Sequence, residues 1–144
     1  QKRVFSLIPA LKNAEYLRYG VMHRNTYIQS PDVLNRDFSV KNNRRLFFAG
    51  QITGVEGYVE SAASGLLAAI RIADEILGRP THVFDERTVC GALQTHISTP
   101  TKDFQPMNAN FGILAPMPVR IRDKKERYRA LAERAIATIQ EMKE

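Results

Sequence analysis

The stretch from Arg45 to Gly78 constrains the fold of this chain more than any other. It begins with an apolar run, Leu46–Ala49, whose length and composition predict a buried strand. Three glycines punctuate the loop that follows this run: Gly50, Gly54 and Gly57. A helical pattern rich in small residues then starts at Tyr58 and ends near Leu77.

A strand, a glycine-rich turn and a helix N-terminus in this order predict a binding site. The first N–H groups of a helix have no partner inside the helix, so they attract an anion or a polarised ring carbonyl. Glycine adopts positive φ readily and leaves space for a group to approach the backbone. We therefore predict that the stretch binds a cofactor and that its three glycines clear space for it.

Length and composition describe a domain that we expect to be part of a longer polypeptide. The chain has 144 residues, of which 44% are apolar, and this is enough for one core. It opens on Gln1, within a run that already looks helical. Cys90 is the only cysteine, which excludes an internal disulfide and favours a reducing compartment. No apolar run has the length of a secretory signal or a membrane span, so we expect a cytoplasmic protein without a membrane partner.

The positive charge is concentrated at the two ends of the chain. Residues 1–45 carry nine Lys and Arg against three acids, and residues 118–144 carry eight against five. The middle carries four against seven. This distribution suits a polyanion such as nucleic acid, although composition alone favours the simpler explanation of a solvated surface.

Hydrophobic periodicity and breakers predict the regular elements. They are a short helix within 1–12, one or two strands over 17–28, a connector over 29–45, a helix from 57 or 58 to 77, a short helix over 88–96, an ordered loop over 101–118 and an amphipathic helix over 123–143. We divide the chain into a main part, residues 1–117, and a basic C-terminal helix packed on it, residues 118–144. No internal repeat is present.

Several polar residues allow two interpretations each. Asn108 and Asn110 present amides to a pocket or make local Asx turns. The triplet at residues 23–25, His-Arg-Asn, lines a site or is an exposed segment.

The same holds for the remaining charged and reactive side chains. The cations of the last helix, at Lys124, Lys125 and Arg127, solvate it or form a polyphosphate groove. Cys90 is interpreted as a buried apolar residue because no helper is adjacent to it. The histidines at 82 and 96 lack metal-ligand spacing, and we predict no metal site.

Four segments resemble one known family, in the same order and over nearly the whole chain. LFFAGQITGVEGYVESAASGLLAAI closely resembles the C-terminal flavin-contacting motif of the folate- and FAD-dependent tRNA uracil-C5 methyltransferases, the TrmFO family. The other three are RYGVMHRNTYIQSP at 18–31, DFQPMNANFGIL at 103–114 and RDKKERYRALAERA at 122–135.

The resemblance implies an α/β fold, the C-terminal part of a Rossmann-like, GidA-related FAD-binding domain that is incomplete without N-terminal sequence. It implies an enzyme that methylates C5 of a T-loop uridine in tRNA, with methylenetetrahydrofolate, FAD and NAD(P)H as cofactors. The partners implied are tRNA, folate and the missing N-terminal part of the same polypeptide. The family's catalytic cysteines lie in that part, so we assign no catalytic residue here and expect the isolated chain to be inactive.

The resemblance also implies two sets of site residues. The FAD-binding set is Gly50, Gln51, Gly54, Glu56, Gly57, Tyr58, Val59 and Glu60. The folate- or RNA-binding set is His23, Arg24, Asn25, Asn108, Asn110, Lys124, Lys125 and Arg127. Within the second set, a histidine ring that sandwiches the folate pteridine is placed at His23.

Three other functions are also compatible with the sequence. A paralogue of the same chemistry would methylate ribosomal RNA, and a cofactor-free basic module would only bind RNA. The related tRNA wobble-uridine enzymes share the glycine pattern, but EGYVESAASG differs from their usual TGYEEAAAQG. A sheet that lacks strands exposes an edge, so we expect homo-oligomers or aggregation of the chain by itself.

Overall fold

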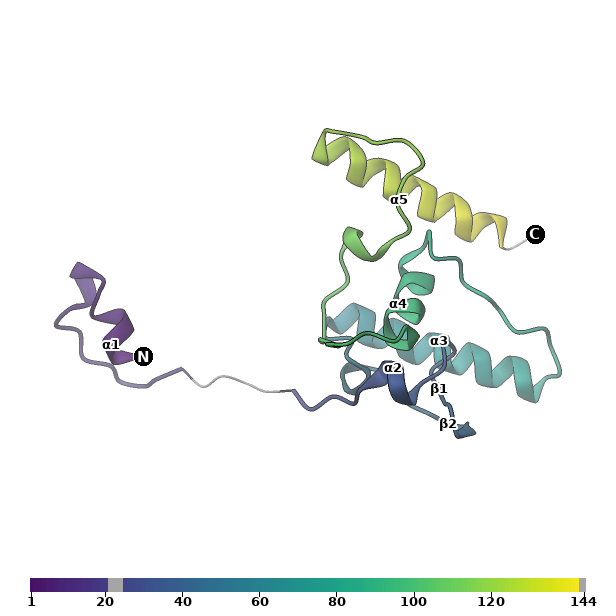
Figure 1. Cartoon of the computed structure of the whole chain (residues 1–144), viewed down its shortest axis with the longest axis horizontal. Helices are drawn as coiled ribbons and strands as arrows, with labels where there is room; N and C mark the ends of the chain where they lie inside the picture. The colour runs from purple at the N-terminus through teal and green to yellow at the C-terminus, as the bar shows by residue number, and fades with distance from the viewer. Residues whose placement is uncertain (21–24, 143–144) are drawn as a thin grey trace.

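The computed structural model describes residues 1–20 and 25–142, which form helices and one small sheet (Figure 1). The α-helices are α1 (Lys2–Phe5), α2 (Ser30–Val33), α3 (Tyr58–Ile76), α4 (Val89–Ser98) and α5 (Lys124–Glu141). The sheet pairs β1 (Ser39–Val40) with β2 (Asn43–Phe47) in antiparallel orientation. Short 3-10 turns are η1 (Pro9–Leu11), η2 (Gln51–Thr53) and η3 (Phe111–Ile113).

The core forms where α2, the sheet, α3 and α4 meet. α4 contacts α2, α3 and η3, and it lies between α3 and α5 in Figure 1. Its Leu93 and Ile97 are fully buried. The buried apolar cluster consists of Leu34, Phe38, Val55, Leu67, Ala68, Leu93 and Ile97. A short helix in the middle of the sequence therefore supplies the centre of the packing.

The three main helices begin and end where their capping signals predict. Gly57 precedes α3, and Gly78 follows it with φ +61°. The Thr88 hydroxyl accepts the Gly91 N–H at 3.1 Å and caps α4. Asp123 caps α5 by accepting the Glu126 N–H at 2.8 Å. The helices predicted over 57–77, 88–96 and 123–143 are confirmed within the described residues, where they span Tyr58–Ile76, Val89–Ser98 and Lys124–Glu141. The second extends two residues beyond the predicted end. Side-chain caps fix where α4 and α5 begin.

The predicted strand at 46–49 is shifted and exposed. β2 runs from Asn43 to Phe47, and the Leu46 side chain is 45% exposed. β2 pairs with β1 alone among the described residues. A strand is buried only when neighbouring strands and helices cover it, so the prediction of a buried strand is wrong for this chain taken by itself.

The N-terminal segment, residues 1–20, is a local cluster apart from the core (Figure 1). The Gln1 amide donates to the Gly20 carbonyl at 2.7 Å and accepts the Gly20 N–H at 3.0 Å, which closes the segment. Leu7 and Leu17 are largely exposed. The strands predicted over 17–28 are absent from the described parts of that range, 17–20 and 25–28, where no partner strand is present.

The C-terminal helix is attached to the loop before it. Arg134 donates to the carbonyls of Ala115 and Pro116, the latter at 2.9 Å. Leu131 and Thr138 are its buried residues. The division into a main part, residues 1–117, and a C-terminal helix packed on the same domain, residues 118–144, stays a prediction.

Across the part of the chain that the structure describes, none of the helices combines the length and apolarity that a membrane span requires.

The position of Leu93 in the core gives a test of the packing. Leu93→Ala should lower the free energy of unfolding by roughly 2–5 kcal/mol, because it leaves a cavity among fully buried side chains. Denaturant unfolding followed by circular dichroism measures this cost. Ile136→Ala, at a site that is 61% exposed, is the control and should change stability by less than about 0.5 kcal/mol. Equal costs for the two variants would show that α4 is not the centre of the core.

Candidate functional site

The glycine-rich loop from β2 to α3 is held by hydrogen bonds to the elements around it. Gly50 has φ +82°, and its N–H donates to the Ser64 hydroxyl of α3 at 2.7 Å. The Thr53 carbonyl accepts the Ser30 hydroxyl of α2 at 2.8 Å. Thr53 and Ser30 are fully buried. The loop is therefore a fixed part of the core and not a mobile connection.

The three glycines differ in what occupies the space beside them. A Cβ on Gly54, which has φ +86°, would lie 2.6 Å from the Phe104 ring. A Cβ on Gly57 would meet the Glu60 carboxylate. A Cβ on Gly50 would have nothing within 4 Å. Gly54 and Gly57 thus make room for side chains of this chain, and only Gly50 leaves open space.

Hydrogen bonds join the glycine-rich loop and the start of α3 to residues 107–110, which include the predicted site residues Asn108 and Asn110. Glu60 Oε1 accepts the Ala109 N–H at 2.8 Å. The Met107 N–H donates to the Gly54 carbonyl at 3.0 Å, and the Met107 carbonyl accepts the Glu56 N–H at 3.0 Å. Two predicted site segments that are about fifty positions apart in the sequence therefore form one structural unit.

The N-terminus of α3 lies in this unit, and its first backbone N–H groups are not capped by a side chain. Gly57 contributes no side-chain cap, and the N–H groups of residues 58–60 have no acceptor among the described residues. Tyr58 and Val59 are 91% and 79% exposed. Gln51 is exposed and donates weakly to the Glu56 carbonyl at 3.4 Å. This arrangement presents unpaired donors beside exposed apolar side chains, which suits a ring with a polar edge.

The predicted folate- or RNA-binding residues are not all brought together. Asn108 is exposed beside the glycine loop. Asn110 uses its side chain locally, accepting the Gly112 N–H at 2.8 Å and donating to the Asn108 carbonyl at 3.2 Å. Asn25 is exposed, and His23 and Arg24 lie outside the described residues.

The basic residues form a separate group on α5. Lys124 Nζ lies 5.5 Å from the centre of the Tyr128 ring, and Arg127 Cζ lies 5.6 Å from it. Lys125 is exposed on the same turn. In Figure 1, α5 is drawn on the far side of α4 from α3. The cations are therefore not part of the glycine-loop unit.

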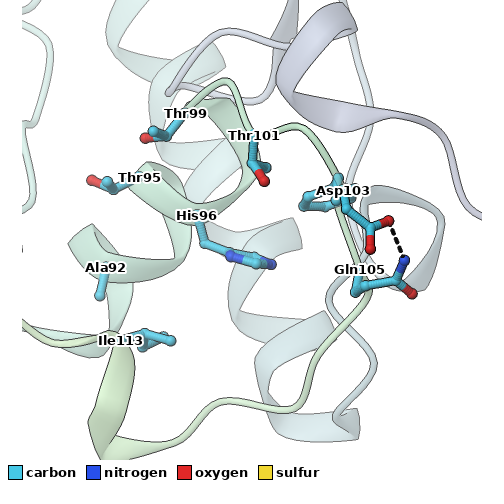
Figure 2. A pocket seen from close by; sticks show the side chains of 9 residues that line it. Ala92, Thr95, His96, Thr99, Thr101, Asp103, Gln105 and Ile113 are labelled. Atoms are coloured by element: carbon cyan, nitrogen blue, oxygen red, sulfur yellow. Dashed lines mark hydrogen bonds between the residues drawn. The ribbon is translucent and has the colours of Figure 1, made fainter.

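A pocket beside His96 was not predicted from the sequence, where this residue was considered only as a metal ligand. The pocket has a volume of about 430 Å³ and lies between α4 and residues 99–105. Figure 2 shows His96 pointing from α4 toward Asp103 and Gln105, whose side chains are hydrogen bonded at 2.8 Å. The His96 and Phe104 rings are 5.2 Å apart.

The surroundings of His96 favour the neutral form of its imidazole. Burial lowers the pKa of His96 below its usual value, and the backbone of Gln105 offsets part of this effect. Nε2 of His96 is buried and has no hydrogen-bond partner among the described residues. Its neighbour Phe104 is the ring that packs on Gly54, so the pocket adjoins the glycine loop.

Cys90 lies on α4 and is partly buried. Burial raises the pKa of the Cys90 thiol above its usual value, which disfavours the reactive thiolate. Within residues 1–20 and 25–142, no group of three or more His, Cys, Asp or Glu side chains is placed to hold a metal ion.

Comparison with known proteins identifies similar sequences. The family model described as glucose inhibited division protein A matches residues 1–80. A Streptococcus suis protein named methylenetetrahydrofolate–tRNA-(uracil-5-)-methyltransferase TrmFO is 55% identical over 143 residues, which is 98% of this chain and 32% of that protein. Proteins with the same name from Bacillus subtilis and Desulfitobacterium hafniense are 56% identical over 141 residues and 51% identical over 144 residues.

These matches confirm the resemblance drawn from the four sequence segments. They extend over 97% and 99% of the chain for the Bacillus and Desulfitobacterium proteins. The chain spans about a third of the length of the curated relatives that it matches.

The contact between Gly54 and Phe104 gives a prediction about stability. Gly54→Ala should cost roughly 2–5 kcal/mol of unfolding free energy, because positive φ is strained for alanine and its Cβ overlaps the ring. The same substitution in a Phe104→Ala background should cost clearly less, since the overlap is gone. A double-mutant cycle by denaturant unfolding measures the coupling. Additive costs would mean that the ring does not determine the need for glycine.

The lowered pKa of His96 predicts an acid-sensitive fold. The usual pKa is 6.5, so below this pH the unfolded chain takes up a proton that the folded chain resists. Stability should therefore fall as pH decreases through 6.5 toward the lower folded-state value. His96→Phe should flatten the dependence of unfolding free energy on pH between about 7 and about 5. Denaturant titrations across this range test it, and an unchanged slope in the variant would contradict it.

Proposed function

Because the chain belongs to the glucose inhibited division protein A family, we propose that it is the C-terminal part of a flavoprotein that methylates C5 of a T-loop uridine in tRNA. Methylenetetrahydrofolate supplies the carbon, and NAD(P)H is the source of reducing electrons. The observation that carries this proposal is the 51–56% identity, over nearly the whole chain, to proteins named for that reaction. Those names favour tRNA over ribosomal RNA as the substrate.

The proposed fold is a Rossmann-like FAD-binding domain that further strands complete. Support comes from the surfaces that the chain leaves uncovered. β2 has one partner strand among the described residues, and Leu46 is 45% exposed on it. On α3, Leu66 and Ile76 are 62% and 77% exposed. Apolar side chains on a long helix are normally covered, and a parallel sheet is normally buried on both faces.

FAD fits the glycine-loop unit. Gly50 leaves open space beside the backbone, and the N–H groups of Tyr58, Val59 and Glu60 have no acceptor among the described residues. When bound, FAD supplies the redox chemistry that converts the transferred carbon into a methyl group. The N–H groups at the N-terminus of α3 would hold the polar edge of the ring, and the helix dipole would favour negative charge there.

Glu60 has a positioning role in this proposal. Its carboxylate links α3 to the backbone of residue 109, which fixes Asn108 beside the loop. Asn108 then offers its amide to the folate or the uridine, whereas the side chain of Asn110 maintains the turn. Gln51, Glu56 and Gly57 complete the wall of the FAD site. His23, Arg24 and Asn25 remain proposed contacts to folate, and Lys124, Lys125 and Arg127 to RNA.

The chain itself contains no residue to which we assign a catalytic step. It orients the cofactor, and the nucleophile and proton transfers belong to the rest of the polypeptide.

We propose that the protein works in the cytoplasm, which suits a free Cys90. In the chain by itself, without those further strands, the uncovered strand edge is where a second copy would pair in a homo-oligomer.

The test is flavin binding and methyl transfer by the complete polypeptide. Purified protein should show visible flavin absorbance and should transfer carbon from methylenetetrahydrofolate to C5 of a uridine in a tRNA transcript. Glu60→Ala should lower flavin occupancy or kcat/KM by roughly tenfold, because it leaves the Ala109 N–H without its acceptor. Glu60→Gln should restore most of the loss, since its amide oxygen still accepts.

Glu75→Ala is the matched control. Glu75 is an exposed acid on the same helix, and it pairs with Arg71 at 3.0 Å, away from the loop. Its removal should leave flavin content and methyl transfer unchanged. Wild-type protein that binds no flavin and methylates no tRNA would contradict the proposed function.

A further inference from the structure

A groove separate from the glycine loop lies between η3 and the start of α5. It has a volume of about 640 Å³, within the size range of ligand sites. Its walls come from η3, from the proline-rich segment over 116–122 and from the first two turns of α5. Its lining includes three arginines, two aromatic rings and a proline: Arg120, Arg122, Arg127, Phe111, Tyr128 and Pro118.

An aromatic pair forms one wall of this groove. The Phe111 and Tyr128 rings are stacked, with centres 4.6 Å apart and planes inclined by 26°. Neither ring is fully buried. Pro118 and the 70% exposed Val119 extend the apolar surface. The wall therefore offers flat apolar surface to a ligand at the surface of the protein.

Cations without acidic partners surround this wall. Arg120, Arg122 and Lys124 are exposed, and in the part of the chain that the structure describes no carboxylate lies within ion-pair distance of them or of Arg127. The acids nearest in sequence are Asp123, which caps α5, and Glu126, which is exposed beside it. The cations outnumber these two acids, so the groove has a positive field.

The other arginines near α5 are already occupied. Arg129 pairs with Glu133 at 2.8 Å on the outer side of the helix. Arg134 is bound to the carbonyls of residues 115 and 116. The unpaired cations are therefore gathered at one end of α5, around the stacked rings.

We infer that this groove binds unpaired nucleotides of the RNA substrate. Arg120, Arg122, Lys124 and Arg127 bind the phosphates, and one base or ribose packs against the Phe111 and Tyr128 rings. A basic groove that follows the backbone, combined with aromatic side chains for the bases, is how proteins bind single-stranded RNA. An acidic peptide would match the charge but would make no use of the stacked rings. The inference rests on the proposed function, because that function supplies an RNA with an unpaired loop.

The experiment measures RNA binding by the complete polypeptide. The probes are a fluorescently labelled RNA hairpin with an unpaired loop and a blunt duplex made from the same stem. Arg122→Ala and Arg127→Ala should each weaken binding to the hairpin. Each should also reduce the slope of log K against log salt by about 0.7–0.9, the value for one lost phosphate contact. Arg129→Ala is the control and should leave the slope unchanged, because this side chain is 82% exposed outside the groove.

The aromatic wall is tested with Tyr128. Tyr128→Leu should weaken binding to the hairpin by about tenfold and leave binding to the duplex unchanged, because stacking requires an unpaired base. Tyr128→Phe keeps the ring and should bind as wild type. Circular dichroism and flavin content should be the same in all variants, which excludes a loss of fold as the cause.

Three results would overturn the inference. One is binding and salt slope unchanged in Arg122→Ala and Arg127→Ala. Another is an equal loss for hairpin and duplex in Tyr128→Leu. The third is displacement of the hairpin by polyglutamate as readily as by unlabelled RNA of the same charge, which would assign the groove to an acidic protein.

Flavin content and methyl transfer separate this inference from the proposed function. If the wild type methylates tRNA while the groove variants bind the hairpin normally, the groove inference alone fails. If the wild type lacks flavin and activity while the groove variants lose the hairpin, the proposed function fails and the RNA groove stands.

Discussion

The contact between the Phe104 ring and Gly54 determines how the parts of this chain fit together. The ring occupies the space in which any other residue at position 54 would carry a Cβ. Its centre also lies 5.2 Å from that of the His96 ring on α4 and 6.2 Å from that of the Tyr27 ring, with which it forms a T-shaped pair. A left-handed turn in the glycine loop, a helix and a loop distant in sequence therefore share one buried side chain. Adding even one methyl group at this point disturbs all three, because protein interiors are close-packed.

The contacts around this ring create the surface that we propose as the FAD site. Met107 pairs with Gly54 and Glu56 through backbone hydrogen bonds, next to the N-terminus of α3, which has no side-chain cap because its N-cap residue is Gly57. Glu60 turns its carboxylate toward the backbone of residue 109 and leaves the first N–H groups of the helix without an acceptor within the described chain. The same few hydrogen bonds thus stabilise the fold and orient the candidate site. Because the Glu60 carboxylate takes part in both, we expect its removal to affect cofactor binding and local structure together.

The uncovered surfaces are as informative as the core. Exposed leucines and isoleucines on β2 and α3 and a strand with one partner fit a domain whose remaining sheet comes from other sequence. The basic end of α5 has a different character, because its cations surround stacked rings and none of them forms an ion pair within the described chain. An exposed apolar surface is typically covered by other protein segments, whereas a basic groove with aromatic side chains typically binds a nucleic acid. The two surfaces therefore suggest two different partners.

The sequence by itself determined the three main helices, since capping by Thr88 and Asp123 and the left-handed Gly78 after α3 are local features. It also determined the family, because the four segments carry enough specific residues to identify it. It predicted the glycine loop as a site, but it assigned the same role to all three glycines. Only the tertiary structure decided that Phe104 fills the space at Gly54, that Glu60 joins two distant segments, and that Asn110 serves a turn. These features depend on contacts between residues far apart in the chain, which local patterns do not encode. The burial of β2 was predicted wrongly for the same reason, because it depends on neighbouring strands and not on the apolar residues of the strand itself.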